Sequence, residues 1–353
     1  MKINYKHFIF ILLSIISLFF VYNDDFIYKE EIIKITDIEI VNTDEQKNFK
    51  GFKETHYYNE ITGIITNGKN KGEKRVIKYE NTESSIDTDK LRVNDKVFIK
   101  LGVIDGIKRD FYMWSLILLF IWLIYLVGKK RGLLSVLSLS INILLFYIGM
   151  VLYFKGINLL FLCVILSIIF SSVSLIIAGG KNEKTKSAII SSIISIITLL
   201  ILTLIVVYFT KYKGININEL KFLTVPAEDV IIPELIMGSL GAIMDVAITI
   251  CSAISELIEK DKKISNENLI KSSKEIGKDI MSTMSGVLFF TYIAAGLPIF
   301  VLAARNGYNI FNFINANFSL ELTRFLVGSI GLIMTIPIST RVAIKMFRGD
   351  NHE

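Results

Sequence analysis

Three of the acidic residues in one apolar stretch are the first candidates for chemistry in this chain. The stretch Pro226–Ile258 is long enough to cross a lipid bilayer, and it carries Glu234, Asp245 and Glu256. Charged side chains are costly inside a membrane and usually mark a path for ions or protons. Each acid follows the previous one by eleven positions, which at about 100° per residue ends roughly 20° past three full turns of a helix. We therefore expect one helix face to carry acids at three depths, where they would handle a cation or a proton.

Asp245 is the strongest of these candidates because it lies near the middle of the stretch. Thr249 and Ser252 follow it by four and seven positions and would flank it on the same face, and Ser239 would add a third hydroxyl group. Together these oxygen atoms would form a cation or proton site. The alternative is a structural carboxyl group that is protonated or hydrogen-bonded to a neighbouring helix.

The remaining acids lie nearer the ends of apolar segments. Glu256 would serve as an entry group or as a solvated acid at a helix end, and Asp279 opens a later span at a similar depth. Asp279 is therefore either a partner for Glu256 or an ordinary acid at a helix start. Glu234 follows Pro233 near the start of its helix, where an acid complements the helix dipole without further function.

Small residues surround the acids. Gly238, Gly241 and Ala242 include a small-xxx-small spacing that lets helices approach closely, so we expect a central helix. The two cysteines, Cys163 and Cys251, have no CxxC or metal-ligand partner and are interpreted as packing residues. We expect no metal site, and the sequence indicates no cofactor.

The composition places the chain among membrane proteins. Hydrophobic residues make up 52% of its 353 residues, and the mean hydropathy is +0.54, values that exclude an ordinary soluble enzyme. The net charge of +6 comes largely from lysines and arginines in short loops between apolar runs. This is the positive-inside pattern, and it argues against a nucleic-acid partner.

The sequence predicts a polytopic α-helical membrane protein with about eight transmembrane helices. Residues 1–22 form an N-terminal anchor, because bulky residues and no cleavage pattern follow the apolar run, and residues 111–353 form a seven-helix membrane domain. The basic loops place both termini in the cytoplasm. The expected spans cover residues 7–22, 111–127, 133–154, 159–178, 187–209, 226–258, 279–304 and 322–346.

Residues 23–110 differ from the rest of the chain. They are polar and of mixed charge, with short Ile- and Val-rich segments such as KITDIEIV and EITGIIT between turn signals such as NGKNKG. We expect a small β-rich domain, a barrel or a sandwich, on the extracytoplasmic side. It shows no catalytic constellation.

Two segments resemble the YibE/F family of bacterial multi-pass membrane proteins. One is GSLGAIMDVAITICSAISEL, residues 238–257, and the other is LIKSSKEIGKDIMSTMSGVLFFTY, residues 269–292. The likeness covers most of the chain and implies an anchor, an external β-rich region and a membrane bundle in a bacterial cytoplasmic membrane. It draws attention to Gly241, Asp245, Glu256, Gly277 and Asp279, and it implies no reaction.

Three functions remain open. The first is a transporter in which the acidic face carries a proton or cation, with the substrate unspecified. The second is an envelope sensor or assembly factor that binds an envelope protein partner through its external domain. The third is an intramembrane aspartyl hydrolase that would need Asp245 and Asp279 close enough to share a proton, although the expected depths of the two acids match poorly.

Overall fold

The structure is a computed structural model that describes residues 5–47, 51, 53–85, 88–215, 225–305, 307–309, 311–312, 314 and 318–348. The chain divides into two compact units, Met1–Val127 and Gly128–Glu353. The expected loop that precedes Pro226 lies partly outside the described residues, because 216–224 are not among them.

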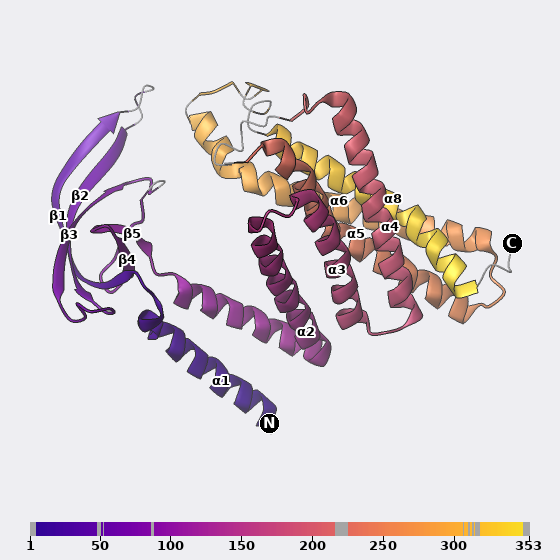
Figure 1. The fold of residues 1–353 in the computed structure, drawn as a ribbon, viewed down its shortest axis with the longest axis horizontal. Coiled ribbons are helices and arrows are strands. Elements are labelled where there is room, and N and C mark those ends of the chain that lie inside the picture. The colour runs from indigo at the N-terminus through magenta and orange to yellow at the C-terminus, as the bar shows by residue number, and fades with distance from the viewer. Residues whose placement is uncertain are drawn as a thin grey trace. The chain divides into compact units, whose positions relative to one another are not determined.

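The first unit contains one antiparallel sheet between two helices in the sequence (Figure 1). Helix α1 (Tyr5–Tyr22) is followed by a short 3-10 helix, η1 (Asp24–Ile27), and helix α2 (Asp110–Phe154) begins after the sheet. The five strands are β1 (Glu31–Lys47), β2 (Lys53–Ile65), β3 (Lys74–Thr82), β4 (Lys96–Lys100) and β5 (Val103–Ile107). The predicted small β-rich domain is therefore confirmed as an antiparallel sheet.

The sheet curls so that its two ends approach each other. Its strand order is β3-β2-β1-β4-β5, and β3 also contacts β5. This connectivity is that of the five-stranded, partly open Greek-key barrel called the OB-fold. Alternate β-branched residues of the strands fill the barrel interior, because successive side chains of a strand point to opposite faces. The fully buried side chains include Ile33, Ile35, Ile65 and Val97.

Within the residues that the structure describes, six helices are long and apolar enough to cross a membrane. They are α2, α3 (Leu159–Gly179), α4 (Glu183–Thr210), α5 (Ala227–Lys260), α6 (Asn266–Arg305) and α8 (Ser319–Arg348). The apolar part of α1, Ile9–Tyr22, is shorter than these. Helix α2 is interrupted at Lys129, whose φ of 48° and ψ of −125° are not helical.

Helix α5 is the centre of the second unit, since it packs against α3, α4, α6 and α8 (Figure 1). Its buried residues include Ile236, Ile243, Val246 and Ile250. The close approach of α8 to α4 depends on Gly331 of α8. A Cβ added there would lie 2.9 Å from a methyl group of Leu199 of α4. Small residues thus permit the tight packing that holds membrane helices together without a hydrophobic driving force.

Candidate functional site

One face of α5 remains exposed although the rest of the helix is mostly buried. Its exposed residues include Gly241, Asp245, Thr249 and Glu256, while the intervening positions contribute to the core. Spacings of three to four residues place these exposed residues on one side of the helix. We call Glu234, Asp245 and Glu256 the acidic stripe.

The carboxylate of Asp245 has no partner within the part of the chain that the structure describes. The Thr249 hydroxyl donates to the backbone oxygen of Asp245 at 2.6 Å. Neither a hydrogen bond nor an ion pair joins that carboxylate to another described residue. An unpaired carboxylate midway along an apolar helix is unfavourable in lipid and is free to take a proton or a cation.

Glu234 is held differently from Asp245. An Nη2 atom of Arg324 on α8 lies 2.6 Å from its Oε1, and the other terminal nitrogen of Arg324 bonds Glu321. Arg324 and Glu321 did not stand out in the sequence, because the pairing partner lies ninety positions from Glu234. The sequence does place Arg324 at the start of an apolar span. A charged group there usually needs a partner inside the membrane.

Two of the hydroxyl groups expected near Asp245, those of Ser239 and Thr249, donate to backbone oxygens of their own helix. Ser239 is buried, and its hydroxyl donates to the backbone oxygen of Leu235 at 2.7 Å. Ser252 is half-buried. Ala242, one of the small residues expected to allow close helix packing, lies in the hydrophobic core.

Gly238 of α5 lies in contact with Tyr292 of α6. The phenol of Tyr292 donates to the backbone oxygen of Gly238 at 3.2 Å. An added Cβ at this position would lie 2.6 Å from the phenol oxygen, which is closer than real Cβ contacts allow. By contrast, nothing within 4 Å would meet a Cβ at Gly241.

Asp279 lies inside a helix and not at a helix start. Helix α6 begins at Asn266, so the polar residues that precede the expected span 279–304 form its first turns. The segment is helical because it buries Leu269, Ser273 and Gly277 on one side and exposes its lysines on the other. Asp279 and Glu256 are both exposed, and among the residues the structure describes no hydrogen bond or ion pair joins either acid to the other or to Asp245.

A second group of charges lies in the first unit, where the sheet meets α1 and α2. The Nζ atom of Lys108 is 2.5 Å from a carboxylate oxygen of Asp24, 3.3 Å from Asp25 and 2.8 Å from Asp110. Lys96 adds a 2.7 Å contact with Asp25. We call these five residues the junction cluster.

The junction cluster is buried and internally paired. The Lys108 side chain is only 2% exposed. Burial alone would lower the pKa of Lys108, but hydrogen bonds to Asp110 and Asp24 hold it above its ordinary value. Burial and the hydrogen bond to Asp110 raise the pKa of Tyr28 to about 12. The cluster is therefore a structural ion network.

A hollow of about 380 Å³ lies on the sheet. It is lined by residues of β1, β2 and β3, among them Tyr58, Lys78 and Glu80. Glu80 also lies 2.9 Å from His56, and its charge raises the pKa of Tyr58. Charged and aromatic side chains thus line this hollow on the sheet.

Comparisons with known proteins cover nearly the whole chain. The family described as YibE/F-like protein matches residues 116–349, and the YibE/F family N-terminal domain matches residues 26–108. The second match contains all five strands, and the first contains the acidic stripe. No curated protein and no solved structure matches the chain.

Proposed function

The chain belongs to the YibE/F family, and from this premise we propose that it is a membrane transporter driven by, or specific for, a proton or a small cation. The unpaired carboxylate of Asp245 carries this proposal. Acids within membrane helices that lack a structural partner are typical of proton relays and ion paths. In this interpretation, Asp245 takes up the ion from one side of the membrane and releases it to the other.

The three acids of the stripe are too far apart for direct exchange of a proton. Eleven residues of helix correspond to roughly 16 Å along the axis, whereas a hydrogen bond spans about 3 Å. Water must therefore connect Asp245 with either end, and access must alternate between the two sides. Glu256 serves as the group at one end, while Glu234 is held by Arg324.

The proposed topology has eight spans, with both termini in the cytoplasm of a bacterium and residues 23–110 outside it. The interruption at Lys129 supports this topology, since it divides α2 into two segments within the basic sequence GKKRG. The anchor is α1, and the divided α2 supplies the second and third spans.

Cysteine labelling tests this topology. With Cys163 and Cys251 replaced by serine, Lys71→Cys and Lys130→Cys each introduce one exposed thiol. A membrane-impermeant reagent is expected to label the first variant in intact cells and the second only after permeabilisation. The opposite pattern would reverse the orientation.

Ion flux in liposomes tests the role of Asp245. Full-length protein is reconstituted with a lumenal pH dye, and a pH or cation gradient is imposed. We expect Asp245→Asn to reduce the flux at least tenfold, because the amide cannot bind and release a proton, and Asp245→Glu to retain part of it. The matched control is Asp229→Asn, which removes an exposed acid from the first turn of the same helix. Flux at the wild-type level in Asp245→Asn would exclude this residue from the path.

The hollow on the sheet favours a second candidate function, the binding of an envelope partner. Deletion of residues 25–108 distinguishes the two proposals. Flux that survives the deletion would assign a regulatory role to the sheet. Absence of flux with and without the sheet, together with loss of partner binding on deletion, would favour a sensor or assembly factor.

A further inference from the structure

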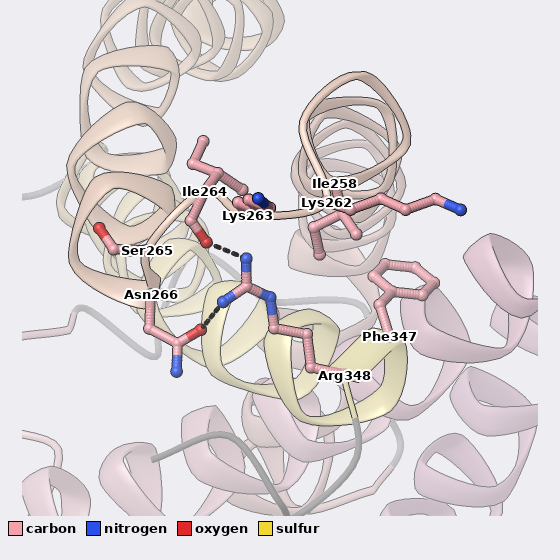
Figure 2. A pocket seen from close by; sticks show the side chains of 8 residues that line it. All are labelled: Ile258, Lys262, Lys263, Ile264, Ser265, Asn266, Phe347 and Arg348. Carbon is pink, nitrogen blue, oxygen red and sulfur yellow. Dashed lines mark hydrogen bonds between the residues drawn. The ribbon is translucent and has the colours of Figure 1, made fainter.

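A basic hollow of about 690 Å³ lies where α5 and α8 end and α6 begins. It is formed by the turn that joins α5 to α6 and by the last residues of α8, all within the second unit (Figure 2). Three cationic side chains line it, namely Lys262, Lys263 and Arg348. This site is separate from the acidic stripe and is not needed for the proposed transport.

The three cations have no carboxylate partner in the described part of the chain. No ion pair joins Lys262, Lys263 or Arg348 to an acid described by the structure, and the nearby carboxylate of Asp261 accepts from the backbone N–H of Lys263 at 2.9 Å. Like charges that gather without an internal counterion repel one another. An anionic ligand would relieve this repulsion.

Arg348 is fixed in place by uncharged groups of the described residues. One of its Nη atoms donates to the side-chain oxygen of Asn266 at 2.6 Å, and the other donates to the backbone oxygen of Ile264 (Figure 2). A guanidinium group has five N–H donors, so these two bonds leave donors for a ligand. Pre-positioned guanidinium groups bind phosphate oxygens strongly because the bonds are charge-assisted and directional.

The other walls of the hollow are apolar. Ile258, Ile264 and Phe347 line it while packing against the core of the unit, and the Phe347 ring lies beside Ile258 and Lys262 (Figure 2). A free inorganic anion would gain nothing from these side chains. A ligand that joins a phosphate group to a hydrocarbon portion would use both kinds of wall.

We propose that this hollow binds an anionic phospholipid through its phosphate group. The phosphate contacts Arg348 and the two lysines, and the glycerol and upper acyl carbons lie against Phe347 and Ile258. Basic pockets at the ends of membrane helices are suited to this chemistry, because the headgroup and the helix ends lie at the same depth.

Native mass spectrometry of the full-length protein in detergent tests the proposal with phosphatidylglycerol and phosphatidylcholine as probes. We expect phosphatidylglycerol to bind more tightly, and Lys262→Gln with Lys263→Gln to weaken its binding about tenfold. The matched control is Lys271→Gln with Lys274→Gln, which removes two exposed lysines from α6 that do not line the hollow. The control is expected to bind within twofold of the wild type.

Three results would overturn the proposal. Equal binding of the two lipids would show that negative charge is not recognised, and an equal loss in the control variant would show an effect of net charge alone. Displacement of the lipid by millimolar inorganic phosphate, with direct binding of that phosphate, would assign the hollow to a free anion. The exposed lysines are dispensable for folding, so all variants should keep the wild-type unfolding temperature.

Discussion

The junction cluster and the acidic stripe both place carboxylates among apolar surroundings, but they treat the charges in opposite ways. At the junction, Lys108 lies within 3.3 Å of three aspartates. On the stripe, Asp245 has no hydrogen bond or ion pair from any residue that the structure describes. Replacement of Lys108 should therefore destabilise the first unit, whereas replacement of Asp245 should leave the second unit folded.

This contrast separates structural charge from charge that is available for function. A buried charge with a complete set of partners is held in one protonation state, because breaking any pair leaves another group uncompensated. An unpaired carboxylate can change its protonation state without disturbing the fold. The pair between Glu234 and Arg324 lies between these extremes, since Glu234 is 37% exposed.

The largest effect is expected for Lys108→Met. This change leaves Asp24, Asp25 and Asp110 without their shared cation and should destabilise the first unit by about 3 to 5 kcal/mol. Pulse proteolysis of the full-length protein, read by cleavage within residues 31–107, measures it. Lys100→Met is the matched control, because Lys100 is an exposed residue of the same sheet. Similar losses of stability in both variants would mean that the junction cluster has no special role in stabilising the first unit.

A smaller loss is expected for Arg324→Met. It leaves Glu234 and Glu321 without their shared cation, and because the Glu234 side chain is partly exposed, we expect a destabilisation of about 2 kcal/mol. Thermal unfolding of Arg324→Met, Glu234→Gln and the double variant forms a mutant cycle. Additive losses would mean that the two side chains do not stabilise the fold as a pair.

Acid should weaken the junction cluster only at low pH, because the pKa of its carboxylate Asp25 is held down by nearby cations. Burial alone would raise the pKa of Asp25, but hydrogen bonds from Lys96 and Lys108 hold it below its ordinary value of 3.8. The carboxylate therefore contributes stability that is fully present above pH 3.8 and is lost as the pH falls through the lower folded pKa. Pulse proteolysis against pH should show this loss in the wild type and a smaller slope in Asp25→Asn.

The smallest change in stability is expected for Asp245→Asn. No partner is lost, so the free energy of unfolding should change by no more than about 0.5 kcal/mol, although the flux falls. Thermal unfolding in detergent measures this, with Asp229→Asn as the control. A loss as large as that of Lys108→Met would mean that Asp245 is a structural acid.

Sequence patterns predicted most of the fold because its elements are set by local periodicity. The polar, Ile-rich character of residues 23–110 predicted the sheet, and the apolar runs predicted the helices. Helix α6 begins at Asn266, before the expected span 279–304, which excludes its lysine-rich first turns because they are too polar to be part of a predicted span. Burial of Leu269 and Gly277 against the rest of the unit extends the helix, and such tertiary contacts are invisible to a hydropathy window.

The site was predicted less completely. The spacing of Asp245, Thr249 and Glu256 indicated a common face, and all three are exposed on α5. Ser239 lies six positions before Asp245, a separation that turns it away from that face, and it is buried. Arg324 and the junction cluster depend on pairings between distant segments, which no local pattern can reveal.

The junction cluster also sets an order for the synthesis, export and folding of the first unit. Asp24 emerges from the ribosome 84 positions before Lys108, so the network cannot close until every strand has been synthesised. In the proposed topology, it also cannot close until the sheet has crossed the membrane, and Asp24 and Asp25 remain hydrated until then. Closure of the cluster is thus a late step in biogenesis that only a fully exported sheet can complete.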